Sequence, residues 1–439
     1  MTRSKTVACG AGFAGDRIEP AVLAAVSGQV DAIALECLAE RTLVPGLRAR
    51  RENSDAGADP RLKRRLGPLL QPAFAHNTRI ISNLGAANPA AAAHQIAKLA
   101  HELDCTELKV AGVTGDDVLA LADQVAWSVP VDFGDLLGAH AYLGCAPIVE
   151  AIDAGADVVV TGRVADSALF SAEVVSILED QQDALAGATT VGHLLECSGH
   201  ITGGNYEHPH RQPLSASDLA SLGFPLARVH GDGSAEIHLL EHAPGIIDVF
   251  NCALQLLYEV HDPAAYITPD VIIDFTAVRL EQVGPNRVRV SGARSKGRPQ
   301  TLKVSGFIER PGFIADVEIG FAGRGCLDRA KLAVDVLRER LHYLPSEDVR
   351  IDVVGLNSVL GDISSPAYNA LPEARTHISV RCSDLEMAQT IEDEVFGLTL
   401  SGPSAGGSLR SERRPRLEVV DGLIERDLVK TELVWGNGG

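Results

Sequence analysis

Long hydrophobic runs are missing from this chain of 439 residues, which has no stretch of about 18 consecutive apolar residues. A helix needs roughly that length to cross a lipid bilayer, so we expect no transmembrane segment. The N-terminus, MTRSKTVACGAGFAGDR, has two early cations but lacks the apolar core of a signal peptide. The sequence therefore predicts a cytoplasmic protein.

Cysteine and aromatic residues are also sparse. The 8 cysteines include no CxxC pair, the spacing typical of structural zinc sites, and are too few for a disulfide scaffold. Aromatic residues make up 4% of the chain, whereas Ala, Val and Gly are abundant. This composition favours a reduced protein built from closely packed layers of helices and sheet.

Basic residues are outnumbered, with 39 Lys and Arg against 58 Asp and Glu and a net charge of −19. A nucleic-acid-binding protein needs a basic face, so we expect no nucleic acid partner. The hydrophobic content of 46% and the charged content of 22% are ordinary for a globular protein. At this length, two or three domains are expected.

Short β-rich runs alternate with helical stretches in the first half of the chain. Asn88 is a predicted N-cap followed by Pro89, and a second helix begins near Pro147 and ends at Gly155. Near-continuous apolar strands between helices indicate βαβ units and a mostly parallel sheet, either open or closed into a barrel. The predicted strands are 6–9, 32–35, 79–82, 108–113 and 157–161.

The pattern changes near residue 225. Residues 235–320 contain a series of strand-like runs, with GPN as the turn of a hairpin, and 329–341 is an amphipathic helix. We expect an α/β domain at 1–225, a strand-rich α+β domain at 226–345 and an α+β segment at 346–439. The basic cluster RSERRPR (410–416) is expected in a solvated loop.

Gly10, Gly12 and Gly15 form a GxGxxG pattern after the first predicted strand, with Glu36 about 20 residues further on. This is the pattern of a dinucleotide-binding turn. However, Pro20 would interrupt the helix that this turn requires, and Asp16 places a negative charge where the phosphates would bind. We therefore expect no NAD(P) here, and interpret the segment as a catalytic loop, an anion-binding loop or a simple tight turn.

Several segments together resemble the acyclic terpene utilisation (AtuA-like) family. They extend in order from about residue 5 to at least residue 320, and no single one would be specific alone. The chain departs from the family after TGG, where Asn205-Tyr206 replaces a common Tyr-Phe pair, so His208 and His210 are not taken as metal ligands. The segments are GAGFAGDRIEP, ALECLAERTL, SNLGAANP, VTGDD, AYLGCAPIVEAIDAGADVVVTGRVADSALF, GHLLECSGHITGG, YEVHDPAAYITPDV and VRLEQVGPNRVRVSGAR.

The resemblance implies a role in the breakdown of citronellol-like terpenes and other branched acids through coenzyme A thioesters. It also implies a small partner protein of about a hundred residues, which some relatives carry as an extra domain. We further expect a homo-oligomer.

Polar residues follow most of the predicted first-half strands. Because the carboxyl ends of parallel strands meet at one edge of a sheet, we expect these residues to share one site. Arg17 and Arg163 suit a carboxylate or phosphate, and the acids suit general base or metal-ligand roles. Salt bridging and helix capping are the alternatives for each single residue. The expected catalytic residues are Asp16 and Asp116; the substrate-binding ones are Arg17, Arg163, Asn83, Gly85 and Asp166; possible ligands of a divalent metal are Glu36, Glu40 and Asp117.

The segment HLLEC adds a second candidate group. His193 and Glu196 are three residues apart and share a helix face, so the carboxylate could orient His193 as a general base. Cys197 would be a nucleophile only with a lowered pKa, and a buried structural role is favoured. Gly203 and Gly204, just after, would let a substrate approach the backbone.

Taken together, these features predict an enzyme that acts on a branched carboxylate or its coenzyme A thioester. Hydration, dehydration or isomerisation next to a carbonyl fits best, because it needs a base and a clamp for the enolate but no redox cofactor. A divalent metal is possible and not required. The alternatives are a non-catalytic subunit that binds a thioester or scaffolds a complex, and an NAD(P)-dependent oxidoreductase.

Overall fold

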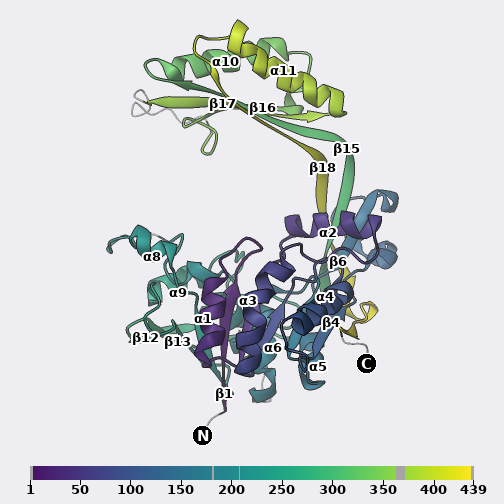
Figure 1. Cartoon of the computed structure of the whole chain (residues 1–439), viewed down its shortest axis with the longest axis vertical. Helices are drawn as coiled ribbons and strands as arrows, with labels where there is room; N and C mark the ends of the chain where they lie inside the picture. Colours follow the sequence, from purple (N-terminus) through teal and green to yellow (C-terminus); the bar gives the residue numbers. More distant parts are fainter. Residues whose placement is uncertain (1–2, 180–181, 207, 362–370, 437–439) are drawn as a thin grey trace. The chain divides into compact units, whose positions relative to one another are not determined.

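The structure is a computed structural model that describes residues 3–179, 182–206, 208–361 and 371–436 (Figure 1). Its contacts divide the chain into two compact units. Unit 1 comprises Met1–Phe307 and Val419–Gly439, and unit 2 comprises Ile308–Glu418, so unit 2 is an insertion in the sequence of unit 1. Among the described residues, no helix is both long and apolar enough to cross a membrane.

A parallel sheet forms the centre of unit 1, as the sequence predicted. The strand order is β1-β2-β3-β7-β4, and each neighbouring pair is parallel. All five predicted strands are present within a few residues of their expected ends. They are β1 (Ser4–Ala11), β2 (Ala32–Leu35), β3 (Arg79–Ser82), β4 (Val110–Thr114) and β7 (Val158–Thr161).

Antiparallel strands extend this sheet at both edges. One edge continues through β8 (Leu226–His230), β9 (Ala235–His238), β13 (Arg287–Ser291) and β12 (Arg279–Gly284), and β19 (Glu432–Trp435) pairs with β4 at the other edge. The hairpin predicted at GPN joins β12 to β13. Since the ten strands end at β12 and β19, the described sheet is open, which decides between the two expected forms.

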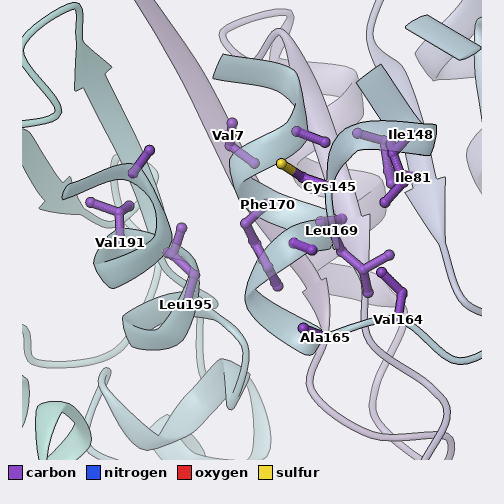
Figure 2. Packing of buried hydrophobic residues seen from close by; sticks show 14 of the residues in the cluster. Val7, Ile81, Cys145, Ile148, Val164, Ala165, Leu169, Phe170, Val191 and Leu195 are labelled. Carbon is purple, nitrogen blue, oxygen red and sulfur yellow. The ribbon is translucent and has the colours of Figure 1, made fainter. Parts of the chain in front are cut away.

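Helices cover both faces of the sheet, because alternate strand residues point to opposite sides. Val7 and Cys9 lie in one buried apolar cluster and Ala8 in another, and the same alternation recurs along β2. The first cluster includes residues of α5 (Ala146–Asp153), α6 (Asp166–Val174) and α7 (Gln182–Leu195), as Figure 2 shows around Leu169 and Phe170. The second includes residues of α1 (Glu19–Ser27), α3 (Leu62–Ala75) and α4 (Pro89–Glu102).

The helices begin where the sequence predicts. The Asn88 side chain accepts a hydrogen bond from the Ala91 N–H at 3.2 Å and caps α4, which contributes about 1 kcal/mol. Pro147 lies in the first turn of α5, and Pro20 lies in the first turn of α1, which leaves residues 12–18 as a loop. The remaining elements of unit 1 are α2 (Glu40–Glu52), α8 (Ala216–Ala220), α9 (Val249–Leu256), β5 (Ala126–Trp127), β6 (Leu136–Ala141), β10 (Tyr266–Ile267), β11 (Ile272–Asp274) and β14 (Arg294–Ser295).

Unit 2 is an antiparallel sheet with helices on one face. The chain enters it along β15 (Thr301–Ala322) and leaves along β18 (Gly407–Glu425). Strands β16 (Val349–Val354) and β17 (Glu373–Cys382) pair beside β15, and α10 (Cys326–Arg340) and α11 (Leu385–Ser401) share one apolar cluster with them. Figure 1 shows both helices on the same side of the strands.

Two expectations for the second half differ from the structure. The cluster 410–416 lies in strand β18, not in a loop, because carboxylates on other elements accept its charges: Arg414 lies 3.0 Å from Asp316, and Arg413 lies 3.6 Å from Glu392. The expected boundaries at 225 and 345 also differ from the division into units, because β8, β9, β12 and β13 extend the first sheet.

The insertion leads to a prediction. A Cβ on Gly306 would lie 2.9 Å from Val420, so the two chain ends at which unit 2 is inserted are adjacent within unit 1. Replacing residues 308–418 by a short Gly-Ser linker should therefore leave unit 1 folded. Circular dichroism and thermal unfolding of the shortened protein should show one cooperative transition. Loss of that transition would mean that unit 1 depends on the insertion.

Candidate functional site

A cavity of about 720 Å³ lies in unit 1 over the carboxyl ends of β1, β2 and β7. The loops after these strands form part of it, and the segments after β6, α7 and α9 complete it. Of the residues predicted for the site, these line the cavity: Asp16, Arg17, Glu36, Glu40, Arg163, Asp166, Glu196 and Gly204. The fold thus brings together residues up to 188 sequence positions apart, counted from residue 16 to residue 204.

The glycine-rich loop after β1 is closed on itself by Asp16. Its carboxylate oxygens accept hydrogen bonds from the backbone N–H of Gly12 at 2.9 Å and of Arg17 at 2.8 Å. A Cβ on Gly12 would lie 2.7–2.9 Å from the backbone of residues 196–198. A side chain at position 12 would clash with residues 196–198, so the position requires glycine. The Gly12 N–H, which a bound phosphate would need as a donor, already donates to Asp16.

Three acids, Glu36, Asp166 and Glu196, are gathered at the buried part of the cavity. Burial raises the pKa of Asp166 well above its usual value, and the charges of Glu36 and Glu196 raise it further. Its Oδ1 is buried and has no hydrogen-bond partner among the described residues. Burial also raises the pKa of Glu36, whose Oε1 accepts bonds from the Leu38 N–H at 2.8 Å and the Asn83 amide at 3.1 Å. Asp166 therefore keeps its proton to a higher pH than an ordinary aspartate does.

Arg163 supplies the positive charge beside these acids. Its side chain is 3% exposed, its guanidinium lies 4.0 Å from the Tyr142 ring centroid, and one of its N–H groups donates to the Leu38 carbonyl. Its Nε is buried without a partner among the described residues. The guanidinium is thus fixed in place and retains a free donor inside the protein, as an anion-binding group requires.

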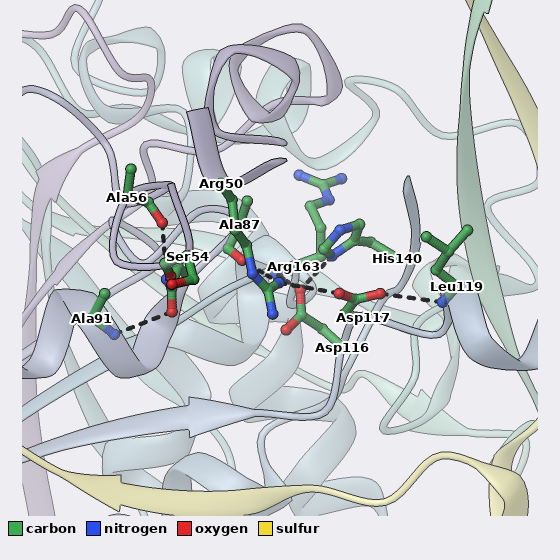
Figure 3. A network of polar contacts seen from close by, with 11 residues as sticks. Arg50, Ser54, Ala56, Ala87, Ala91, Asp116, Asp117, Leu119, His140 and Arg163 are labelled. Carbon is green, nitrogen blue, oxygen red and sulfur yellow. Dashed lines mark hydrogen bonds and ion pairs between the residues drawn. The ribbon is translucent and has the colours of Figure 1, made fainter. Parts of the chain in front are cut away.

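Asp116 lies behind Arg163 rather than in the cavity. One oxygen of its carboxylate accepts hydrogen bonds from the backbone N–H of Arg163 and from His140 Nδ1, both at 2.8 Å (Figure 3). Asp117, next in sequence, pairs with Arg50 at 3.1 Å and is 38% exposed. Asp116 therefore positions Arg163, and the expectation that it shares the cavity with Asp16 was wrong because its side chain turns beneath the loop.

His193 and Glu196 form the predicted contact, with 2.8 Å between Nδ1 and Oε1, but their positions exchange the expected roles. Glu196 lines the cavity, whereas His193 is 1% exposed and lies behind it. His193 Nε2 faces the Leu256 carbonyl at 3.3 Å, so both ring nitrogens face acceptors. Burial alone would lower the pKa of His193, but Glu196 more than offsets this and the pKa is raised. Burial raises the pKa of Glu196 as well, whereas the charge and hydrogen bond of His193 oppose that rise.

Three further predicted residues lie outside the cavity wall. Asn83 is fully buried and braces the loop after β2 through Glu36 and the Cys37 N–H. Gly85 allows the Thr161 carbonyl to approach, since a Cβ would lie 2.4 Å from it. Gly203 lines a separate pocket with His208 and Arg211. The contacts of Asn83 and Gly85 thus hold the loop after β2 and the end of β7 in place.

Sequence reasoning missed other residues of the cavity, His200 among them. Burial lowers the pKa of His200, so its imidazole is neutral, and its Nδ1 is buried without a partner among the described residues. Glu259 lines the cavity with a φ of 59°, a strained conformation for a non-glycine residue. The only signal for His200 was its place in CSGHITGG, beside the predicted Gly203 and Gly204.

Apolar residues line another part of the cavity. Phe13, on the loop after β1, is 57% exposed and Leu219 is 45% exposed, and both line the cavity with the buried Leu222 and Phe224. The Cys197 thiol also lines it, but burial raises its pKa far above neutral, so the thiol is not an activated nucleophile. The cavity therefore combines charged and apolar lining residues.

The possible metal ligands do not converge. Glu36 and Glu40 line the cavity, but Glu40 accepts from the Ser305 hydroxyl at 2.9 Å and Asp117 lies elsewhere with Arg50. In the described parts of the chain, no group of three or more His, Cys, Asp or Glu side chains is arranged to hold a metal ion.

Comparison with known proteins gives one match. The family model described as acyclic terpene utilisation family protein AtuA matches residues 6–435, nearly the entire chain. The chain belongs to the AtuA family. No curated protein and no solved structure matches it. The match confirms the resemblance found in the sequence and links this AtuA family member to acyclic terpene utilisation.

The raised pKa of Asp166 predicts a pH-dependent stability for this AtuA family member. An acid that holds its proton more tightly when folded destabilises the fold as pH rises from the unfolded pKa, about 3.9, towards the folded one. Asp166→Asn removes that cost, so it should raise Tm at pH 8 and have a smaller effect at pH 5. Thermal unfolding at both values measures this. Asp123→Asn, at an exposed position, is the control, and equal effects of the two variants would contradict the raised pKa.

Proposed function

We propose that this protein is a cytoplasmic enzyme of acyclic terpene or branched-acid catabolism that acts on an acyl coenzyme A thioester by hydratase/lyase or isomerase chemistry. One observation carries the proposal: two carboxyl groups in different electrostatic surroundings line the same cavity. Burial raises the pKa of Asp166 well above its usual value, and Glu36 and Glu196 raise it further. Burial also raises the pKa of Glu196, but the charge and hydrogen bond of His193 oppose this rise and favour its ionised form. Pairs of titratable groups whose environments separate their pKa values are typical of acid–base catalysis.

The charge of the cavity favours a thioester over a free acid. Among the described lining residues, six carry carboxyl groups and two carry guanidinium groups. As the reacting group inside the cavity, a carboxylate would be repelled by this excess, whereas a thioester carbonyl is neutral and accepts hydrogen bonds; the anionic phosphates of coenzyme A would lie outside the cavity. The protonated Asp166 and the free Nε donor of Arg163 are suitable partners for that oxygen.

The proposed reaction moves two protons. Glu196 removes a proton from water, and the resulting hydroxide forms a bond to Cβ of a 2-enoyl thioester. The double-bond electrons pass to the thioester oxygen as an enolate, which Arg163 stabilises, and Asp166 then delivers its proton to Cα. After this step Glu196 carries a proton and Asp166 is ionised. Transfer of that proton from Glu196 to Asp166 through water restores the starting state of the enzyme. The reverse sequence is dehydration, and proton transfer without water addition is isomerisation.

Three residues support these groups. His193 acts through Glu196 and is a positioning residue, as is Asp116, which holds the backbone of Arg163. His200 offers a neutral imidazole on the cavity wall, where it suits the positioning of water. No redox step is involved, so the proposal includes neither NAD(P) nor a required metal, and activity should survive dialysis against EDTA.

The proposal also includes a homo-oligomer and a small partner protein of about a hundred residues. Neither contributes a group to the reaction written above. The activity assay is therefore run on the purified chain alone and again after purification together with the small partner protein.

Substitutions of the two carboxyl groups test the reaction. Asp166→Asn and Glu196→Gln should each lower kcat/KM for hydration of branched 2-enoyl coenzyme A thioesters by about 10²–10⁴-fold, because each removes one proton transfer. His193→Gln should lower kcat and move the acidic limb of the pH–rate profile to higher pH, since Glu196 loses its cation. Loss of absorbance of the conjugated thioester measures all three.

Asp123→Asn and Glu107→Gln change exposed acids of unit 1 and serve as matched controls, with rates expected within twofold of the unmodified protein. If the unmodified protein binds the thioester but does not turn it over, both alone and with the small partner protein, it is a non-catalytic binding subunit. Activity that requires added NAD(P) would indicate an oxidoreductase and overturn the proposal.

A further inference from the structure

A second cavity in unit 1 lies against the first one. Its volume is about 370 Å³, within the range of about 300–1,000 Å³ that is usual for ligand pockets. Arg17, Leu222 and Phe224 line both cavities, so the two cavities adjoin at these residues. The Arg17 guanidinium donates to the Leu222 carbonyl at 3.0 Å and is about one-third exposed.

The lining of this second cavity is mostly apolar. One wall is the side of α1 that carries Pro20, Leu23 and Ala24, and the opposite wall comes from residues 221–226 and 240–244. Leu226 at its base is 2% exposed, whereas Leu23 at its rim is 58% exposed. The polar lining residues are Arg17, Ser27, Gln29, Ser221, Glu241 and His242.

We propose that this apolar cavity binds the hydrocarbon chain of the substrate, and therefore that the protein prefers medium-length acyl chains over short ones. The inference rests on the proposed function, because it places the reacting carbonyl in the adjoining charged cavity. Two observations support this occupant: the wall that the two cavities share at Leu222 and Phe224, and the mostly apolar lining of the second cavity.

The shared wall gives Arg17 a defined place. With its guanidinium held at Leu222, it lies at the point where a chain would pass from the charged cavity to the apolar one. The aliphatic part of an arginine packs well against hydrocarbon while its charged end stays hydrated. Arg17 is therefore assigned to the passage, rather than to a carboxylate as the sequence predicted.

Two unreactive probes test the inference: butanoyl coenzyme A and decanoyl coenzyme A, with affinities measured by calorimetry. Decanoyl coenzyme A should bind more tightly, with each additional buried methylene increasing affinity by at most about fourfold. Leu23→Glu places a carboxylate at the rim of the apolar cavity and should lower the ratio of the two affinities at least tenfold. Val26→Glu is the matched control, because Val26 is on the same helix and 56% exposed but lines neither cavity. It should retain the original ratio.

Each other outcome has a distinct meaning. Equal affinity of both probes for the unmodified protein, or equal effects of Leu23→Glu and Val26→Glu, would overturn the chain site while leaving the proposed reaction intact. Failure of both probes to bind would overturn the proposed function and the inference together. If sedimentation shows that Leu23→Glu dissociates an oligomer while the affinity ratio is unchanged, a second copy of the chain covers this surface, and the inference is wrong.

Discussion

Three carboxyl groups buried near one another, those of Glu36, Asp166 and Glu196, impose the constraint on which the rest of the cavity depends. Buried like charges are costly, and a carboxylate without a counter-charge takes up a proton. The protein compensates the charge with Arg163 on one side and His193 on the other. The pKa of Asp166 is raised well above its usual value, so the same electrostatic cost that opposes burial favours a protonated carboxyl group, which is the general acid of the proposed reaction.

The α/β scaffold provides this arrangement with few specialised contacts. Parallel strands buried on both faces bring their loops to one edge, and small residues let those loops approach closely. Gly12 lies against the backbone of residues 196–198, so the segment carrying Glu196 passes directly beside the loop after β1. Asp116 connects the loop after β4 to Arg163 in the loop after β7. Apolar side chains would serve stability as well, so the buried charges of this site carry a cost in folding free energy.

Much of unit 1 could be predicted from the sequence because its signals are local. Apolar runs mark the buried strands, and Asn88, Pro147 and Pro20 mark helix starts whose reasons lie within one turn. The exchanged roles of His193 and Glu196 could not be predicted, because they depend on the Leu256 carbonyl, 63 residues from His193. Strand β18 was mistaken for a loop for the same reason, since the partners of its arginines, such as Asp316, lie on other elements.

A carbon-13 NMR titration of protein labelled at its aspartate carboxyl carbons tests the central claim most directly. The Asp166 signal, assigned by its absence from Asp166→Asn, should titrate well above the ordinary pKa of an aspartate. If every aspartate signal titrates near the ordinary value of about 4, Asp166 is ionised and is not the general acid of this site.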